Sequence, residues 1–381
     1  MKILHTITSL DKGGAENHVA QLGLIQKKKL NQVKFFISKN SNYWPKALKK
    51  KKIDVFKSNY FHERSIHQKI IKIFRDILKL KNIINKYKPD IIHAHLPYME
   101  IITYLTLFIC KEKPKFIISK HVDNVFFQGS IGQKRNLFGA FLERTISKKT
   151  NSIIAISKSV KKFLISDYIG IDRNKIHVVY YGINKSSILK NNIKKINFKK
   201  KFNFNNNELK VGCIARLVPQ KAIDNLIKSL ALIDDKIKLK LIIVGKGPLK
   251  KQLQDLAIKL NVHKKIIWID FLDRIQDFYE FIDIFVLTSR YEGLGFVFLE
   301  SMLFKKPVIA SNSSAMPEIV KNNYNGFLVP QNNTKILSKM IIKLKNKKIR
   351  IRLGQNGFEF VKKNMSLIKM FNKINKIYKN S

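Results

Sequence analysis

Acidic residues are scarce in this sequence. Its 381 residues include 26 aspartates and glutamates against 74 lysines and arginines, and the formal net charge is +48. Such an excess predicts attraction to an anionic partner, either a membrane surface, a nucleic acid or a phosphorylated substrate. A compositional origin is the alternative, because lysine, asparagine and isoleucine share A/T-rich codons and all three are abundant here. Runs of like charge are usually solvated faces in either case.

Cysteine and long hydrophobic runs are scarce as well. The two cysteines, Cys110 and Cys213, lie far apart, which excludes a disulfide framework and a cysteine zinc site and favours a reducing compartment. The longest apolar stretch, residues 98–110, contains Glu100 and is too short to span a bilayer. The N-terminal stretch lacks the apolar core of a signal peptide. We therefore expect a cytoplasmic protein, soluble or peripheral on the inner face of the cytoplasmic membrane.

The pattern of apolar residues predicts two α/β domains. Hydrophobic residues make up 45% of the chain, which excludes bulk disorder, and the length exceeds that of one ordinary core. Short β-branched runs alternate with amphipathic helical segments, as in doubly wound domains with a parallel sheet. The expected strands of the first half are 2–7, 33–38, 90–95, 115–121, 152–157 and 176–182, and those of the second half are 210–217, 238–245, 264–270, 282–289, 307–313 and 326–330.

The alternation pauses in one lysine- and asparagine-rich stretch, which marks the domain boundary. We predict an N-terminal domain over residues 1–185, a linker at 186–207 and a C-terminal domain over 208–360. A basic helix is expected at 361–381, packing back on the N-terminal domain.

The segment from Ser289 to Glu300, SRYEGLGFVFLE, has the residue types of a ligand site. It follows an expected strand, and ligands of open α/β sheets bind outside the carboxyl ends of strands. Glu292 lies in the loop, where a carboxylate can accept hydrogen bonds from hydroxyl groups. Gly293 and Gly295 expose backbone N–H groups beside a helix N-terminus, which suits an anion. Glu300 falls about one turn inside that helix, so the segment suits a long ligand such as a sugar nucleotide.

Other expected strand ends carry weaker signals. Gly13 and Gly14 follow the first strand and begin a helix, which suits a phosphate, although a plain turn would use the same pair. Arg216 and Lys221 flank a loop that leads into a helix, and a guanidinium with an ammonium would suit a diphosphate. His121 ends another strand and could contact a substrate or shuttle a proton.

Two further histidines are ambiguous. His93 and His95 lie two apart on an expected strand and so share one face. No third ligand is evident in the sequence, so we predict no metal site.

Taken together, the motifs resemble those of the retaining glycosyltransferases of the GT-B fold, specifically family 4. The segment from Glu292 to Glu300 is similar to the E-x7-E signature of that family. The ordered set covers nearly the whole chain and comprises GGAE, IIAISKS, VVYYGIN, ARLVPQK, LIIVGKGPLKKQLQDLA, ESM, KPVIAS, MPEIV and GFLVP. The resemblance implies two Rossmann-like domains facing each other across a cleft.

The resemblance also implies residue roles. Glu292 would bind the hydroxyls of the donor hexose, and Glu300 would bind the ribose. Arg216 and Lys221 would hold the diphosphate and stabilise the departing nucleotide. The backbone amides around Gly293, Leu294 and Gly295 would serve the sugar and phosphate, Gly13 and Gly14 would approach the phosphates, and His121 would lie near the transferred sugar. The candidates for catalysis are therefore His121, Glu292, Arg216 and Lys221.

The activity implied is transfer of a hexose-type sugar from a nucleotide-sugar donor, without a metal or other cofactor, in the synthesis of cell-surface polysaccharide or lipopolysaccharide. The partners would be the donor, a saccharide or lipid-linked acceptor and an anionic membrane surface, but not nucleic acid. Two alternatives remain: an epimerase of the same fold, or a basic nucleic-acid-binding protein. The sequence also departs from the family pattern, since Ala215 and Ala222 replace usual glycines and Leu272-Asp273 replaces Leu-Gly near the base.

Overall fold

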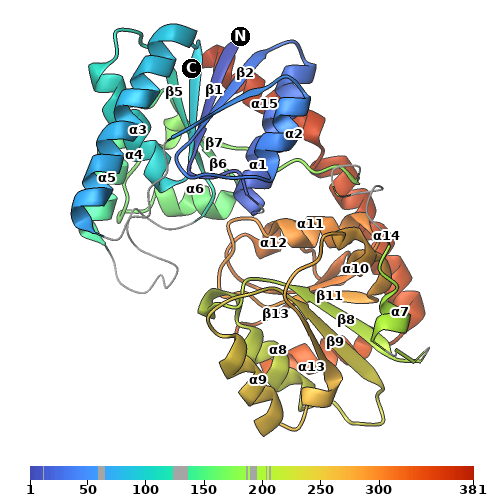
Figure 1. The fold of residues 1–381 in the computed structure, drawn as a ribbon. Helices are drawn as coiled ribbons and strands as arrows, with labels where there is room; N and C mark the ends of the chain where they lie inside the picture. The colour runs from blue at the N-terminus through green and yellow to red at the C-terminus, as the bar shows by residue number, and fades with distance from the viewer. Residues whose placement is uncertain are drawn as a thin grey trace. The chain divides into compact units, whose positions relative to one another are not determined.

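A computed structural model describes residues 1–11, 13–58, 65–122, 136–185, 188, 195–202, 204, 205 and 207–381. The chain forms two compact units (Figure 1). The first comprises Met1–Gly182 with Leu367–Ser381, and the second comprises Ile183–Ser366. Much of the linker expected at 186–207 lies outside the described residues.

The first unit is built on a parallel sheet. Its strand order is β3-β2-β1-β4-β5-β6-β7. The strands are β1 (Lys2–Ile7), β2 (Gln32–Ile37), β3 (Asp54–Lys57), β4 (Ile91–His95), β5 (Lys115–Lys120), β6 (Ser152–Ala155) and β7 (Ile176–Val178). Most residues of β1, β4, β5 and β6 are buried. Strands covered on both faces are expected to read as near-continuous apolar runs, and the sequence shows this.

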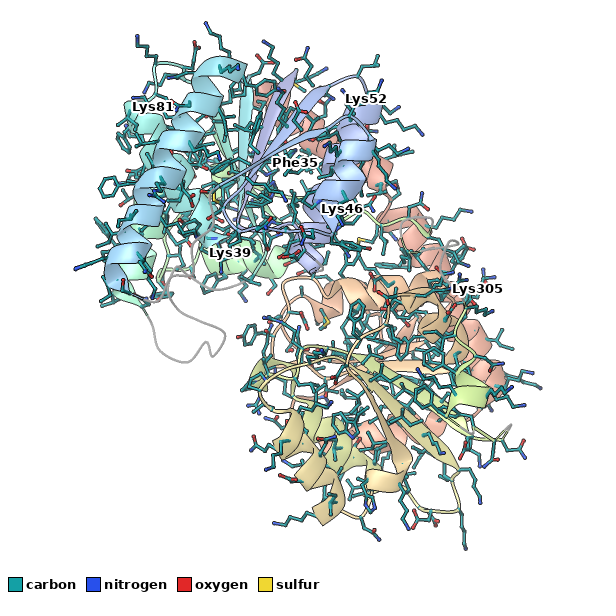
Figure 2. The ribbon with its side chains drawn as sticks, in the orientation of Figure 1. Phe35, Lys39, Lys46, Lys52, Lys81 and Lys305 are labelled. Carbon is teal, nitrogen blue, oxygen red and sulfur yellow. The ribbon has the colours of Figure 1, made fainter. Side chains whose placement is uncertain are left out.

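Helices cover both faces of this sheet. They are α1 (Gly14–Lys28), α2 (Trp44–Lys50), α3 (Ile66–Tyr87), α4 (Pro97–Ile109), α5 (Leu137–Lys149), α6 (Lys158–Leu164) and α15 (Leu367–Asn380). Helices α3, α4 and α5 lie side by side, with α1 and α2 away from them (Figure 1). Figure 2 labels Lys39, Lys46 and Lys52, which are exposed, and Phe35, which is buried in the unit.

Helix α3 shows how local sequence sets the helix limits. Ser65 caps its N-terminus: the Ser65 side chain accepts from the backbone N–H of Gln68, and the Gln68 side chain accepts from that of Ser65. Such a capping box satisfies two N–H groups that would otherwise lack partners. The helix ends at Lys88, whose φ of 49° cannot continue it.

The last helix belongs to the first unit although it follows the second unit in the sequence. Met370, Ile374 and Tyr378 of α15 are buried against β1 and α1, in one cluster with Ile3 and Leu22. Because α15 covers apolar side chains of the first sheet, this core contains the two ends of the chain.

The second unit contains a parallel sheet of order β10-β9-β8-β11-β12-β13. Its strands are β8 (Leu209–Ile214), β9 (Leu239–Val244), β10 (Ile266–Ile269), β11 (Ile284–Leu287), β12 (Val308–Ser311) and β13 (Gly326–Val329). Its α-helices are α7 (Phe198–Lys201), α8 (Ile223–Leu230), α9 (Lys250–Lys259), α10 (Ile275–Phe281), α11 (Phe296–Leu303), α12 (Met316–Ile319), α13 (Thr334–Lys343) and α14 (Lys347–Asn364). Among the helices within the described ranges, none has the length and apolar character needed to cross a bilayer.

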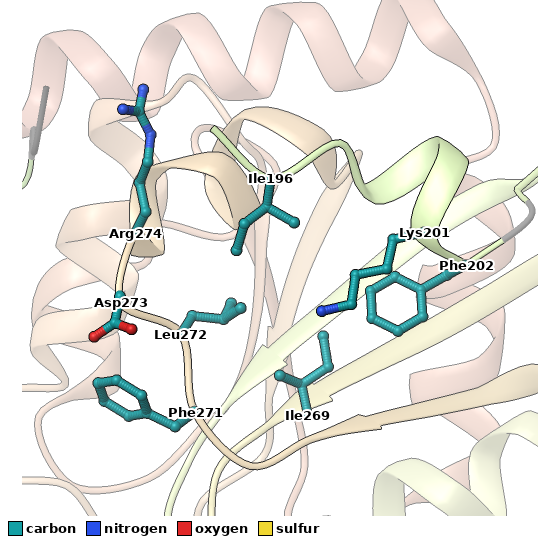
Figure 3. A pocket seen from close by; sticks show the side chains of 8 residues that line it. All are labelled: Ile196, Lys201, Phe202, Ile269, Phe271, Leu272, Asp273 and Arg274. Carbon is teal, nitrogen blue, oxygen red and sulfur yellow. The ribbon is translucent and has the colours of Figure 1, made fainter. Parts of the chain in front are cut away.

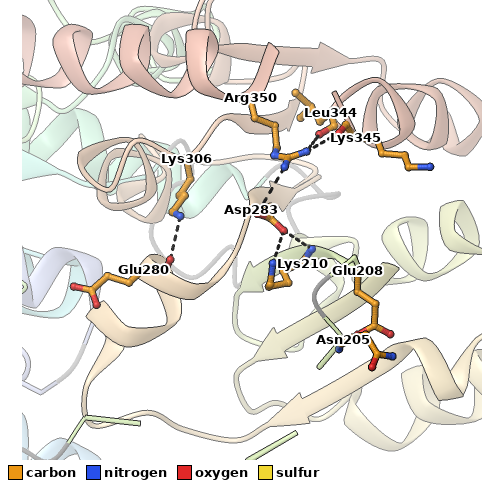
Figure 4. A network of polar contacts seen from close by, with 9 residues as sticks. All are labelled: Asn205, Glu208, Lys210, Glu280, Asp283, Lys306, Leu344, Lys345 and Arg350. Carbon is orange, nitrogen blue, oxygen red and sulfur yellow. Dashed lines mark hydrogen bonds and ion pairs between the residues drawn. The ribbon is translucent and has the colours of Figure 1, made fainter. Parts of the chain in front are cut away.

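A polar network joins the sheet of the second unit to helix α14 (Figure 4). Asp283 accepts from the backbone N of Lys210 at 2.8 Å and from its Nζ at 3.0 Å. Arg350 of α14 lies 4.0 Å from the same carboxylate and donates to the Leu344 carbonyl at 2.8 Å. Nearby, Lys306 Nζ donates to the Glu280 carbonyl at 3.1 Å, and burial lowers the pKa of this lysine.

A buried ion cluster fastens two helices of the first unit to the end of β5. Lys120 pairs with Glu100 of α4 and, at 2.5 Å, with Glu143 of α5. All three side chains are at most 6% exposed. Burial raises the pKa of Glu100 to about 7, against the attraction of Lys120. Removing one partner of such a cluster leaves a buried charge without compensation.

We therefore expect Lys120→Met to destabilise the first unit by about 3–5 kcal/mol, because two carboxylates would then face each other without a cation. The chain has two tryptophans, one in each unit, so Trp44 fluorescence in a Trp268→Phe background follows urea unfolding of the first unit. Lys88→Met is the control, since Lys88 and Glu112 form an exposed pair of about 0–1 kcal/mol. Equal losses in the free energy of unfolding for Lys120→Met and Lys88→Met would contradict a special role of the buried ion cluster.

Candidate active site

The loop after β11 places Glu292 in a buried position beside the start of α11. Glu292 is 8% exposed; its Oε1 accepts from Ser289 Oγ at 2.7 Å and pairs with Lys221 Nζ at 2.5 Å. Gly295 precedes the helix with a φ of +74°. A Cβ there would come within 2.9 Å of Phe298 and Met316 side-chain atoms, so both backbone and space favour glycine.

The loop after β8 brings Lys221 to this carboxylate. Lys221 lies in a 3₁₀ turn, Pro219–Lys221, whereas Arg216 is exposed in the preceding loop. Arg290 N donates to the Gln220 carbonyl at 2.8 Å, and Gln220 Nε2 donates to the Tyr291 carbonyl at 3.0 Å. These bonds hold the two loops together, so the structure unites Lys221 and Glu292, which are 71 positions apart.

A glycine-containing loop supports the Arg216 loop from the other side. Leu217 N donates to the Lys246 carbonyl at 2.9 Å, and Leu249 N donates to the Leu217 carbonyl at 3.1 Å. A Cβ on Gly245 would lie 1.9 Å from the Ala215 carbonyl oxygen, and one on Gly247 would lie 2.3 Å from that of Leu217. The motif LIIVGKG therefore needs its glycines for this close approach of two backbones.

Ala222, which stands where the family pattern has a glycine, adopts a backbone conformation that favours glycine. Its φ is +47° and its ψ is +43°, in the left-handed region, where it precedes α8. An alanine there costs on the order of 1–2 kcal/mol relative to its ordinary conformation. The alanine at this position therefore strains the loop that leads into α8.

Glu300 lies in the second turn of α11 and is partly buried. Its Oε2 accepts a hydrogen bond from Tyr279 Oη at 2.6 Å, and Tyr279 is fully buried. Burial raises the pKa of Glu300 to about 7, although the Tyr279 hydrogen bond opposes the shift. A carboxyl of this kind exchanges donor and acceptor character near neutral pH.

In the first unit, Gly13 and Gly14 lie where α1 begins. Gly13 is extended, and a Cβ on it would lie 2.1 Å from Glu16 Oε2. A Cβ on Gly14 would meet no atom within 4 Å. Space is therefore open at the N-terminus of α1, where backbone N–H groups attract an anion.

His121 follows β5 and is buried. Its Nδ1 faces the Tyr181 hydroxyl, and its Nε2 lies 3.3 Å from His95 Nδ1. Burial, with a smaller effect of Lys120, lowers the pKa of His121 to about 3. The imidazole is therefore neutral at pH 7, and both ring nitrogens contact protein groups.

Two buried histidines that lie beside His93, His95 and His121 were not singled out from the sequence, namely His5 and His18. His5 lies opposite His93 in the register of β1 and β4, and nitrogens of His5, His93 and His95 lie within 4.8 Å of one another. His5 is therefore the third imidazole that was not evident in the sequence. His18 of α1 stacks on Tyr181 with ring centroids 3.9 Å apart, and its buried Nδ1 has no hydrogen-bond partner among the described residues. Only the parallel pairing of strands brings these rings together.

A cavity of about 310 Å³ lies beside the loop that follows β10 (Figure 3). Phe271, Leu272 and Asp273 supply one wall, and Lys201 and Phe202 supply another; Ile196, Ile269 and Arg274 complete the lining. The loop that departs from the usual Leu-Gly pattern thus borders an open space.

Comparisons with known proteins agree with this arrangement. Residues 12–187 match the glycosyltransferase family 4 pattern, and residues 194–360 match the glycosyl transferases group 1. The sequence is 30% identical over 321 residues to an uncharacterised glycosyltransferase of Methanocaldococcus jannaschii, covering 81% of this chain and 83% of that protein. It is 29% identical over 294 residues to the O-antigen biosynthesis glycosyltransferase WclY of Escherichia coli, covering 76% and 79%.

Solved structures show the same fold. The Anabaena protein HepE, in complex with UDP and glucose, superimposes with a TM-score of 0.83 over 100% of both chains, at 18% identity. The two Rossmann-like units therefore define the GT-B fold, which confirms the fold class expected from the sequence. The chain belongs to the group 1, family 4 glycosyltransferases, and it is a glycosyltransferase enzyme.

The pKa shift of Glu300 makes a stability prediction. The folded-state pKa of about 7 lies above the ordinary 4.5, so wild type should lose stability relative to Glu300→Gln as pH rises from 4.5 to 7, by about 3 kcal/mol, and little further above pH 7. Urea unfolding of the second unit, read by Trp268 in a Trp44→Phe background, measures the difference. Glu359→Gln, at an exposed site in the same unit, should show no such trend; a flat difference for Glu300→Gln would refute the shift.

Proposed function

We propose that the protein transfers a hexose-type sugar from a nucleotide-sugar donor to a saccharide or lipid-linked saccharide, with retention at the anomeric carbon and without a metal. The observation that carries this proposal is the buried pair of Lys221 and Glu292 beside the N-terminus of α11. It offers a cation and a carboxylate within two adjoining loops, beside the N-terminal N–H groups of a helix. A diphosphate with a hexose attached needs those three kinds of group.

The residues of the second unit have distinct proposed roles. Glu292 would accept hydrogen bonds from hexose hydroxyls, and Glu300 would accept them from the ribose. Sugar hydroxyls would donate hydrogen bonds to the Glu292 carboxylate and so release Lys221 from its pair with Glu292. Lys221 would then bind the diphosphate together with Arg216. Electrostatic stabilisation of the leaving group by preorganised cations and helix N–H groups is a large contribution to catalysis. The cavity beside Leu272 and Asp273 would hold the base.

The bond changes follow from retention. The bond between the anomeric carbon and the diphosphate oxygen breaks, and the electron pair leaves with the nucleoside diphosphate. The acceptor oxygen bonds to the same face of the anomeric carbon, and its proton passes to the departing phosphate oxygen. Arg216 and Lys221 would neutralise the charge that develops there. Gly13, Gly14 and His121 of the first unit are proposed, from family resemblance, as further donor contacts.

The relatives support a role in cell-surface polysaccharide synthesis. WclY is an O-antigen biosynthesis enzyme, and a further relative, CapM of Staphylococcus aureus, is a capsular polysaccharide biosynthesis glycosyltransferase. HepE was solved with UDP and with UDP-glucose. A uridine nucleotide is therefore the first donor base to test.

The diphosphate contacts can be tested by calorimetry with UDP and uridine. Arg216→Ala/Lys221→Ala should lose roughly ten- to a hundredfold affinity for UDP, because charge-assisted bonds contribute about 1.5–3 kcal/mol, and should bind uridine nearly as wild type does. Arg352→Ala/Lys228→Ala removes the same charge from exposed positions of this unit and is the control. Equal losses for both ligands would exclude diphosphate recognition by this pair. A thermal-shift screen of other nucleotides follows if wild type binds no UDP.

We also propose that the first unit docks on anionic membrane lipid. Three helices expose large apolar side chains: Ile66, Ile70, Ile71, Phe74 and Leu78 on α3, Leu105, Phe108 and Ile109 on α4, and Leu137, Phe138 and Phe141 on α5. The alternative is that the apolar face of α3 packs on the sheet. It holds for the C-terminal half of the helix, where Leu80, Ile83 and Ile84 are buried, and not for the exposed N-terminal half.

The placement of the α3 and α5 side chains favours a membrane near His121. Helices α3 and α5 each lead into a parallel strand, β4 and β6, so their first turns lie at the carboxyl edge of the sheet. His121 lies at that edge too. Exposed Lys69 and Arg75 accompany the apolar residues of α3, and an apolar surface with basic residues suits an anionic interface.

Sedimentation with liposomes tests the docking. Wild type should bind vesicles that contain phosphatidylglycerol at low salt, and high salt should weaken binding because surface charges are screened. Phe74→Ser/Phe141→Ser should reduce binding by roughly tenfold, from the loss of buried apolar area. Ile258→Ser, equally exposed in the second unit, should leave binding unchanged. Binding to neutral vesicles alone, or no binding at low salt, would exclude this surface as an anionic-lipid interface.

A further inference from the structure

A chain of buried hydrogen bonds runs through the first unit to His121. Gln26 Oε1 of α1 contacts His5 Nε2 at 2.7 Å, and His5 Nδ1 contacts His95 Nε2 at 3.1 Å. His95 Nδ1 contacts His121 Nε2 at 3.3 Å, and His121 Nδ1 contacts the Tyr181 hydroxyl. The five side chains come from different segments of the chain and are each at most 7% exposed.

Gln26 connects this series of hydrogen bonds to the last helix, α15. Gln26 Nε2 donates to the hydroxyl of Tyr378 in α15 at 3.3 Å. That hydroxyl lies 2.6 Å from His93 Nδ1, and His93 Nε2 lies 2.7 Å from Ser119 Oγ. When the Tyr378 hydroxyl donates to His93 Nδ1, its oxygen accepts from Gln26 Nε2, and the amide oxygen of Gln26 then faces His5.

The orientation of one amide fixes every ring on the way to His121. Burial lowers the pKa of His5 to about 4 and that of His95 well below its ordinary value, so these rings are neutral. A neutral imidazole carries one N–H and one acceptor nitrogen. Because the Gln26 oxygen accepts, His5 donates from Nε2 and accepts at Nδ1. His95 then donates from Nε2, and His121 must do the same.

We propose that Gln26 and Tyr378 set the tautomer of His121 through His5 and His95, so that His121 carries its proton on Nε2 and accepts the Tyr181 hydroxyl proton at Nδ1. Gln26, His5, His95 and Tyr378 are positioning residues in this scheme. The significance for transfer rests on the proposed function, but the tautomer itself does not. A reversed amide would invert each bond and move the His121 proton to Nδ1.

A metal ion is the competing occupant of this region. Nitrogens of His5, His93 and His95 lie close enough for one cation to contact all three. Their ring nitrogens already have hydrogen-bond partners, so a cation would have to displace several of those bonds. The hydrogen-bonded chain accounts for the observed contacts without that cost.

Nitrogen-15 NMR of the nine histidines tests the tautomers in the full chain at pH 7.5. Wild-type His5, His95 and His121 should each be protonated on Nε2. Gln26→Met removes the amide, and Tyr378→Phe removes the hydroxyl that orients it; each should give His121 a mixed or inverted tautomer. Ser119→Ala is the matched control, because it removes a hydroxyl bonded to a buried histidine on the other side of Tyr378.

Three results would overturn the proposal. They are two His121 tautomers already present in wild type, an unchanged His121 in both Gln26→Met and Tyr378→Phe, and stoichiometric binding of added Zn²⁺ that removes the ring N–H signals of this cluster. Tyr378→Phe keeps the test decisive if Gln26→Met does not fold.

An activity measurement extends the test. Tyr378→Phe should lower kcat roughly tenfold, as loss of outer-shell orienting partners commonly does, with little change in donor KM, and Ser119→Ala should not. If no nucleotide sugar supports transfer by wild type, the proposed function fails, whereas the NMR result still decides on the tautomer chain.

Discussion

Both units depend on one constraint, which is the parallel pairing of their strands. Parallel strands buried on both faces admit few polar side chains along their length and bring all their carboxyl ends to one edge. Polar groups of distant segments consequently gather there: Lys221 meets Glu292, and Lys120 meets Glu100 and Glu143. His5 of β1 and His93 of β4 lie within the sheet instead, where His5 bonds to Gln26 and His93 bonds to Tyr378.

Local pattern was sufficient to predict the strands other than β3, their alternation with helices, and the loop that contains Glu292 and Gly295. Those features arise from periodicity and from glycine positions that are visible within ten or so residues. The contacts that define the site were not predictable in the same way. Tyr279 bonds to Glu300, and His5 joins His93, only because strand order brings them together. The capacity of Ala222 to keep a left-handed backbone also depends on the surrounding loops, and not on its own preference.

The scarce acidic residues are placed where the fold uses them. Asp76 is fully buried and accepts from Ser38 at 2.6 Å and Tyr98 at 2.7 Å, which joins α3 to segments after β2 and β4. Asp277 accepts from the backbone of Ile196 at 2.7 Å and pairs with Arg274 at 2.8 Å. A drift in codon composition would change the exposed positions most easily, where a charge costs little stability. Codon drift is therefore compatible with both the basic surface and the retention of the bonded carboxylates, and it does not conflict with lipid binding by the basic surface.

The return of α15 to the first unit has a consequence for synthesis on the ribosome. Domains made of continuous sequence can fold as soon as they emerge, N-terminal first. Here the second unit is complete in the chain before the first has received Met370, Ile374 and Tyr378. Until then Ile3 and Leu22 lack part of their apolar covering, and Gln26 lacks its hydrogen-bond partner Tyr378. The segment made first is therefore finished last, and the nascent first unit must stay unaggregated while the second folds.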